Sequence, residues 1–283
     1  MAEVSTSSLI EQPSNIAGSK HRHAMTVLEW VAPYAIIVPM LVTWALATHF
    51  NLIMPFLLPS PFAVARWMMN DLVNGSLTYN VAITLYRTMI GFALAAVSGV
   101  AIGIVMARVG AVRWFFDPIL SIMLPMPKVA LLPIFMLWFG LHDSSKILIV
   151  AFSVSVQIVI STYAATRGVE KELLWSARSL GANEREIVRE IVLPAALPQI
   201  LTGLQIAVPV CLIIVVVTEM VMGGRGLGDS MLESARYAKT AGVFAGIIEV
   251  GLLGFGVIKG MDAIRRRLLR WHHEVLRHGD ARR

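Results

Sequence analysis

The sequence predicts an all-α, polytopic membrane protein with six transmembrane helices, and two observations carry this prediction. First, 57% of the 283 residues are hydrophobic and only 15% are charged, whereas soluble domains carry roughly 25% charged residues. Second, the apolar residues gather into six long runs. A bilayer core about 30 Å thick is crossed by roughly 20 apolar residues of helix, so each run is long enough for one crossing.

The six runs follow one another along most of the chain. They lie at about 31–50, 81–107, 115–139, 146–166, 199–222 and 244–262. The first run exceeds the roughly 7 to 15 residues of a signal-peptide core, so we expect an uncleaved span. The second run contains Gly99 and Gly103 in a G-x-x-x-G spacing, which lets membrane helices approach each other closely.

The third run is interrupted by three prolines, Pro125, Pro127 and Pro133. Each proline lacks a backbone N–H and frees a carbonyl group at membrane depth, which is tolerated only where protein or a wet cavity satisfies that carbonyl. The third run therefore predicts either a broken helix beside a solute pathway or a helix that is merely kinked.

Lysine and arginine are distributed unequally between the segments that connect the runs. With a cytoplasmic N-terminus, the inner segments hold sixteen of these residues and the outer segments hold five. Cytoplasmic loops carry such an excess, so we expect both termini and the loop 167–198 in the cytoplasm. The same distribution indicates that the basic residues lie next to a membrane and do not bind a nucleic acid. The predicted organisation is a polar N-terminal tail (1–30), a six-helix membrane domain (31–264) and a basic C-terminal tail (265–283) at anionic lipid headgroups.

Two outer segments offer surfaces to an external partner. Residues 51–61 are too rich in proline to be helical, and residues 62–72 predict a short interfacial helix anchored by Trp67. Residues 223–243 begin with a glycine-rich turn and continue as an amphipathic segment.

The loop 167–198, which we call the polar module, is a long charged stretch in an otherwise apolar chain. Apolar residues at helical spacing predict an amphipathic helix over 169–180, with Glu170 and Glu172 near its positive N-terminal end. Gly181 can adopt the left-handed conformation that ends such a helix. The first half of the module is therefore predicted to be a short helix followed by a tight turn.

The second half of the polar module predicts another helix. Asn183 and, three residues later, Glu186 have the spacing of a capping box. We expect Pro194 and Pro198 to end this second helix. The whole module is then a compact pair of helices that lies across the membrane surface.

The spacing inside the polar module resembles the EAA loop of permease subunits in ATP-driven importers. It reads Trp175-Ser176-Ala177, three residues, Gly181, nine residues, then Ile191-Val192-Leu193-Pro194. Trp175 and Ser176 stand where the family has Glu and Ala, so contacts typical of a subfamily differ here. The resemblance covers about residues 55–265 and implies a MetI-like fold.

Further motifs resemble the nitrate, sulfonate and taurine branch of these permeases. These motifs are Leu58-Pro59-Ser60-Pro61, the run 87–103, Asp117-Pro118, the block 127–140, Thr218-Glu219-Met220 and Gly226-Leu227-Gly228. The resemblance implies a solute that is a small anion or organic acid, such as nitrate, a sulfonate, taurine or a related compound. It also implies a multi-pass protein of the bacterial inner membrane.

The resemblance further implies partners: a second copy of this chain, two ATP-binding cassette subunits and an external substrate-binding protein. ATP and Mg²⁺ would be bound by the cassette subunits, because this chain has no G-x-x-x-x-G-K-[ST] loop and is therefore not expected to be an enzyme. No cofactor is expected in the chain itself. The residues expected to contact the ATPase are Trp175, Ser176, Ala177, Arg178, Gly181, Ala182, Asn183, Glu184, Leu193 and Pro194.

Four charged residues lie close to the hydrocarbon: Arg87, Lys128, Glu219 and Glu249. A charge at the bilayer centre costs at least roughly 2.5 to 3.5 kcal/mol, so each should have a partner or face water. Either glutamate can form a structural bridge with Arg87 or Lys128. Alternatively, these residues together with Pro127 line the translocation path.

Other functions find less support in the sequence. A secondary transporter driven by an ion gradient is the alternative, but such proteins usually show an inverted repeat, and none is convincing here. A membrane-embedded enzyme or a metal site would need clustered ligands or catalytic groups. His142, Asp143, His272 and His273 lack that spacing and are expected on the solvated surface, and Cys211 is expected to be a small buried hydrophobe.

Overall fold

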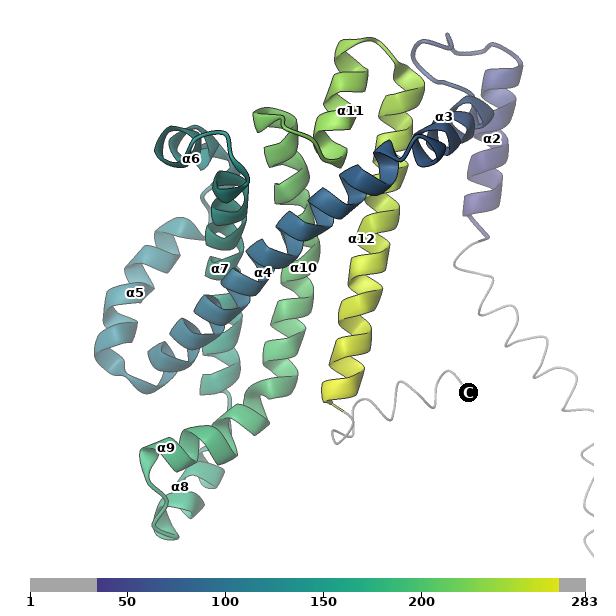
Figure 1. The fold of residues 1–283 in the computed structure, drawn as a ribbon. Helices are drawn as coiled ribbons and strands as arrows, with labels where there is room; N and C mark the ends of the chain where they lie inside the picture. The colour runs from purple at the N-terminus through teal and green to yellow at the C-terminus, as the bar shows by residue number, and fades with distance from the viewer. Residues whose placement is uncertain (1–34, 270–283) are drawn as a thin grey trace, which may run out of the picture. The chain divides into compact units, whose positions relative to one another are not determined.

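This computed structural model describes residues 35–269. The predicted N-terminal tail and residues 270–283 lie outside the described residues. Among these residues, 35–61 and 62–269 belong to two compact units. The helices are α2 (Ile37–His49), α3 (Pro61–Val73), α4 (Ser76–Arg108), α5 (Gly110–Met123), η1 (Lys128–Leu131), α6 (Leu132–Phe139), α7 (Asp143–Arg167), α8 (Lys171–Ser179), α9 (Glu184–Glu186), η2 (Ile187–Val192), α10 (Leu193–Met222), α11 (Leu227–Arg236) and α12 (Thr240–Leu268) (Figure 1).

The first unit contains one apolar helix, α2, which has 13 residues. It corresponds to the predicted span 31–50, whose first residues lie outside the described part. Trp44 Nε1 donates a hydrogen bond to the carbonyl oxygen of Pro59 at 2.9 Å. This bond ties the proline-rich segment 51–60, which is not helical, back to the helix.

The second unit contains the long apolar helices. Within residues 35–269, four helices are long and apolar enough to cross a membrane: α4, α7, the continuous helix Glu184–Met222, and α12. The pair Gly110–Met123 and Lys128–Phe139 makes a fifth if it counts as one span. With the shorter apolar helix α2, these elements are compatible, in order, with the six predicted spans.

The third predicted span is broken rather than merely kinked. Its two halves meet at an angle of 96°, and Pro125 and Pro127 both lie in the segment between them. Pro133 lies in the first turn of α6, where a missing N–H removes no helical hydrogen bond. The break therefore falls where two closely spaced prolines prevent the helix from continuing.

The centre of the second unit is the close contact of α4 with α7. The glycines of α4 face α7 so tightly that a methyl group would not fit. A Cβ on Gly99 would lie 2.8 Å from Ile158 Cβ, and one on Gly103 would lie 2.7 Å from Thr162 Cβ. The predicted close approach at the G-x-x-x-G pair is thus made within the chain, between α4 and α7.

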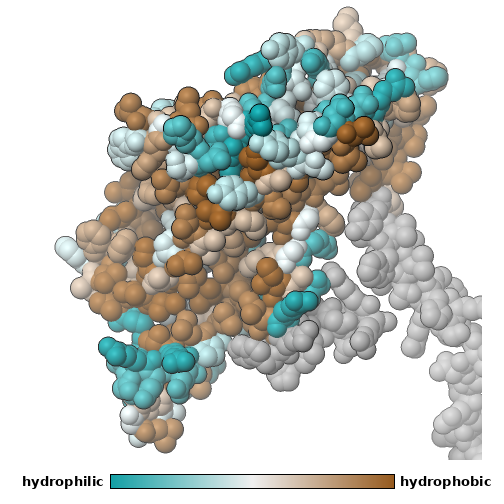
Figure 2. All heavy atoms as spheres, in the orientation of Figure 1, coloured by the Kyte–Doolittle hydropathy of each residue, from teal (hydrophilic) through white to brown (hydrophobic). Residues whose placement is uncertain are grey.

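Helix α10 packs on α7 and α4 and completes an apolar core that includes Ala95, Val154 and Cys211, each of them fully buried. The burial of Cys211 agrees with its expected role as a small hydrophobe. Figure 2 shows a hydrophobic band over the long helices, with hydrophilic residues gathered below it over α8 and α9. The polar module therefore lies beyond one end of the apolar bundle.

The two expected outer helices are present. α3 covers the predicted segment 62–72, and α11 is the amphipathic segment that follows the glycine turn. Both helices lie beside α12. From α3, the Trp67 ring is 5.8 Å from the Nζ atom of Lys239, the residue before α12, and would be 3.0 Å from a Cβ on Gly242 of α12. From α11, Ser234 Oγ would be 2.6 Å from the same Cβ.

The expectation that Pro194 and Pro198 end a helix is wrong. The helix continues from Glu184 to Met222 through both prolines. Residues Ile187–Val192 just before them form a π-helical segment, whose wider turn moves the preceding carbonyl groups away from the proline ring. The second helix of the polar module is therefore the beginning of a membrane helix, not a separate surface helix.

Candidate functional site

The polar module begins with α8, whose one buried residue is Ala177. Ala177 belongs to the same buried apolar cluster as Ile187 and Val192 of η2. After α8 the chain turns at Gly181, which has a left-handed φ of 86°, and the N–H of Ala182 donates to the Ala177 carbonyl oxygen at 3.0 Å. The predicted helix and its glycine ending are confirmed.

The second half of the module starts with the predicted capping box. Asn183 Oδ1 accepts hydrogen bonds from the N–H groups of Arg185 and Glu186, both at 3.0 Å. Glu186 Oε2 accepts a hydrogen bond from the Asn183 N–H at 2.8 Å. The polar side chains therefore satisfy free backbone donors at the start of the second helix.

The module exposes large apolar side chains at its tip. Leu180 is 88% exposed and Trp175 is 59% exposed, and both lie on or just after α8. Of the other residues expected to contact the ATPase, Ser176, Arg178, Gly181, Asn183 and Glu184 are exposed, Ala182, Leu193 and Pro194 are partly buried, and Ala177 is buried. The predicted set therefore forms an exposed ridge on a buried base.

Glu184 connects three elements of the structure. Its Oε1 accepts from Arg178 Nη2 at 2.9 Å and Nε at 3.2 Å, and its Oε2 accepts from Arg108 Nη2 of α4 at 2.5 Å. These hydrogen bonds, first that of Arg178 and then that of Arg108, lower the pKa of the exposed Glu184 carboxyl. The sequence placed Glu184 in the module but gave no indication of Arg108 as its partner.

A second polar feature, which we call the buried charge cluster, lies at the opposite end of the bundle. It consists of Arg87, Asp143, Lys146 and Glu219. Arg87 Nη1 donates to Glu219 Oε1 at 2.7 Å, and Arg87 Nη2 donates to Asp143 Oδ1 at 2.6 Å. Arg87 and Lys146 are each only 1% exposed, so two cations and two carboxylates offset each other in a mostly dry site.

The cluster also holds the glycine turn that follows α10. Arg87 donates to the carbonyl oxygens of Arg225 at 2.7 Å and Gly224 at 3.1 Å, and Lys146 Nζ donates to that of Gly223. On the other side, Glu219 Oε2 accepts from the Gly228 N–H at 3.1 Å. The turn is therefore fixed by backbone contacts to buried charges.

The cluster resolves part of what the sequence left open. The structural bridge between Arg87 and Glu219 is present. Asp143 was expected on the solvated surface, but it is an ion-pair partner of Arg87, although its side chain remains 55% exposed. Lys146, the first residue of the predicted span 146–166, is buried in the first turn of α7, which begins at Asp143.

The remaining path candidates do not join this cluster. Lys128 Nζ donates to the Leu124 carbonyl oxygen at 2.9 Å across the break in the third span, and Pro127 is exposed beside it. Glu249 of α12 is 6% exposed, and its Oε1 has no hydrogen-bond partner within residues 35–269. The break therefore carries the exposed Pro127 and the partly buried Lys128, whereas Arg87, Glu219 and Glu249 are buried.

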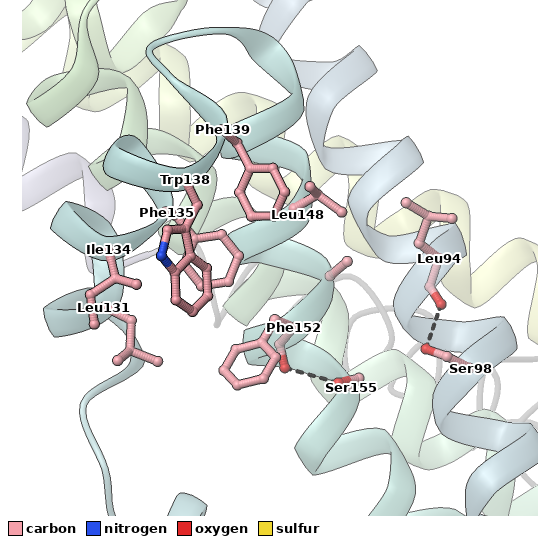
Figure 3. A pocket seen from close by; sticks show the side chains of 11 residues that line it. Leu94, Ser98, Leu131, Ile134, Phe135, Trp138, Phe139, Leu148, Phe152 and Ser155 are labelled. Atoms are coloured by element: carbon pink, nitrogen blue, oxygen red, sulfur yellow. Dashed lines mark hydrogen bonds between the residues drawn. The ribbon is translucent and has the colours of Figure 1, made fainter.

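An apolar cavity of about 720 Å³ opens between α4, α6 and α7 (Figure 3). Four aromatic residues line it, Phe135, Trp138, Phe139 and Phe152. Its two hydroxyl groups are bonded to backbone: Ser98 donates to the Leu94 carbonyl and Ser155 to the Phe152 carbonyl. No charged side chain lines the cavity, so it suits an apolar group and offers no counter-charge to an anion.

Residues 99–270 match the profile of a family described as the binding-protein-dependent transport system inner membrane component. The chain belongs to this family. The matched region includes the polar module, both halves of the broken span and the last three long helices. The permease is 33% identical to the taurine transport system permease protein TauC of Escherichia coli (strain K12), over 83% of this chain and 86% of that protein.

A second relative is a putative aliphatic sulfonates transport permease protein, SsuC of Bacillus subtilis (strain 168), which is 30% identical over 81% of this chain and 83% of its own length. Among solved structures, an inward-facing MetNI methionine ABC transporter matches with a TM-score of 0.56 and 21% identity, over 68% of this chain and 95% of that chain. An amino acid ABC transporter solved with histidines matches with a TM-score of 0.59 and 17% identity, over 70% and 97%. The permease therefore has the all-helical, MetI-like fold and is an inner-membrane component of an ABC importer.

Proposed function

We propose that two copies of this permease form the membrane path of the importer. Two ATP-binding cassette subunits, which bind ATP and Mg²⁺, and an external substrate-binding protein complete the assembly. Family membership supports these partners. The excess of Lys and Arg in the inner segments supports an arrangement in which both termini and the polar module face the cytoplasm, the side where ATP is available.

We propose that the polar module is the docking site for the ATPase, and its exposed tip carries this proposal. Leu180 and Trp175 stand on a hydrophilic end of the molecule, where exposed large apolar side chains mark a protein interface rather than a lipid contact. Because η2 and α10 continue the second helix of the module without a break, a force applied to the module is passed directly to a membrane helix.

Copurification tests this docking. We expect the cassette subunit to copurify with the wild-type permease and to be lost, at least tenfold, with Leu180→Asp. A matched control is Val73→Asp, because Val73 is 80% exposed and ends α3, far from the module (Figure 1). That variant should retain the ATPase.

Equal ATPase recovery with both variants would contradict docking through the module tip. Uptake that persists in membranes without any cassette subunit would instead indicate a carrier driven by an ion gradient. Thermal melting of both variants in detergent shows whether either change acts through folding, and Leu180→Asp should leave the melting temperature unchanged because its side chain is exposed.

We propose that the solute is a small sulfonate or a related organic anion. The support comes from the two relatives named for taurine and aliphatic sulfonates. The break, with the exposed Pro127 and the partly buried Lys128, is the proposed part of the path, since Lys128 is a cation that no carboxylate within residues 35–269 neutralises by an ion pair. In the full importer, we expect saturable uptake of labelled taurine that an aliphatic sulfonate inhibits, and absence of such uptake with an active ATPase would contradict this assignment.

A further inference from the structure

We infer that Arg108 is a positioning residue that links the end of α4 to the polar module. Arg108 is the last residue of α4, and its Nη2 lies 2.5 Å from Glu184 Oε2. The two residues are separated by 76 positions in the sequence. Within the described part of the chain, this is the one ion pair that joins α4 to the module.

The geometry makes Glu184 a shared contact of three helices. One carboxylate oxygen is held by Arg178 from α8 and the other by Arg108 from α4. Glu184 is also the first residue of α9, where a negative charge is favoured by the helix end. A displacement of either half of the module must therefore move Glu184 relative to Arg108 or carry Arg108 with it.

The position of Arg108 determines which part of the membrane domain a displacement of the module would move. Val109 is the one residue between Arg108, where α4 ends, and Gly110, where α5 and the broken span begin. The path from the ATPase to the break then has two branches. One runs through the continuous helix into α10, and the other runs through Glu184 and Arg108 to the turn between α4 and α5.

The exposure of the Arg108–Glu184 ion pair indicates whether it holds the module folded or only links it to α4. The Glu184 side chain is 65% exposed and that of Arg108 is 19% exposed, and a partly exposed ion pair changes an equilibrium by roughly 1.5- to 5-fold. The fold of the module depends instead on the buried apolar cluster that contains Ala177 and Ile187. Loss of Arg108 should therefore weaken the link without unfolding the module.

This inference rests on the proposed docking of the ATPase. The experiment uses the full importer in lipid nanodiscs, with a nitroxide on Ala111→Cys at the exposed start of α5. The distance between the labels of the two copies is measured by pulsed electron resonance with and without ATP. The native Cys211 is fully buried and should not be labelled.

The test compares Arg108→Gln with Arg113→Gln. Arg113 is a matched control in the same region, because it carries the same charge and its Nε lies 3.9 Å from Asp117 within α5, not near the module. We expect wild-type recovery of the ATPase with both variants. In the wild type, ATP should shift a fraction of the molecules to a new label distance. We expect this fraction to be about two- to fivefold smaller with Arg108→Gln, to be unchanged with Arg113→Gln and to be partly restored by Arg108→Lys.

The other outcomes separate the two proposals. Failure of the wild-type permease to recover the ATPase would contradict the docking itself. An unchanged response with Arg108→Gln, or an equal loss with Arg113→Gln, would overturn the role of Arg108 while leaving the docking intact. Reduced ATPase recovery with Arg108→Gln would also overturn it, since Arg108 would then act on docking rather than on the link to α4.

Discussion

The buried charge cluster yields the sharpest prediction of stability. Glu219→Gln removes one of the two carboxylates that pair with Arg87 and leaves it the half-exposed Asp143. Removing one partner of a buried ion pair costs about 3–5 kcal/mol, because the other charge stays buried without compensation. The amide nitrogen would also oppose a donor, because the Glu219 carboxylate accepts hydrogen bonds from Thr84, Arg87 and the Gly228 N–H.

Asp143→Asn is the matched comparison. Its side chain is half exposed and Arg87 keeps Glu219 as a partner, so we expect a loss of only about 1 kcal/mol. Both free energies of unfolding are measured by reversible SDS titration of the permease in mixed micelles, followed by tryptophan fluorescence. Equal losses for the two variants, or a loss below about 1 kcal/mol for Glu219→Gln, would refute the view that burial sets the strength of this cluster.

Three further predictions concern local packing and exposure. Gly103→Ala should lower the free energy of unfolding by about 1–3 kcal/mol because its new methyl group would meet Thr162. In the same titration Gly251→Ala, with no atom within 4 Å, should not lower it and should raise it by up to about 1 kcal/mol, since alanine favours a helix interior. Gly181→Ala should destabilise the module turn by about 1–2 kcal/mol through its left-handed backbone alone, seen as faster amide exchange confined to the module. Cys211 should react with a maleimide only after unfolding, since it is fully buried, and rapid labelling of the native permease would contradict the packing of α10.

The features that the sequence predicted well are local ones. The length of an apolar run alone indicates whether it can cross a membrane, and a capping box needs only Asn183 and Glu186 at the right spacing. Gly181 likewise ends α8 by a property of its own backbone. These signals lie within a few residues of the structure they specify, so the helices and the turn of the polar module could be identified without knowing how the chain packs.

The continuation of the helix through Pro194 could not be identified in this way. A proline normally ends or kinks a helix, and the π-helical turn that accommodates it depends on tertiary packing. Ile187 and Val192, at the two ends of that turn, are both buried against the rest of the module and α10. Whether such a wide turn is stable depends on neighbours that the local sequence does not contain.

The sequence could not show which residues pair with the buried charges, for the same reason. Arg87 pairs with Asp143 and Glu219, which lie 56 and 132 positions further along the chain. The sequence showed that charges near the hydrocarbon need partners, but the choice among carboxylates depends on which helices pack together. Asp143 was misjudged because its position at the start of α7 gives it one exposed face and one face toward α4.

The glycine contacts between α4 and α7 have a consequence for motion. Since the backbones meet where no methyl group fits, a slide of one helix along the other by even one residue would place bulkier side chains against the partner backbone. The two helices are therefore expected to shift as a rigid body during any transport cycle. Shear must then be confined to less extensive contacts, such as those of α12, of whose 29 residues only Gly242, Ala245, Gly246, Glu249 and Met261 are buried.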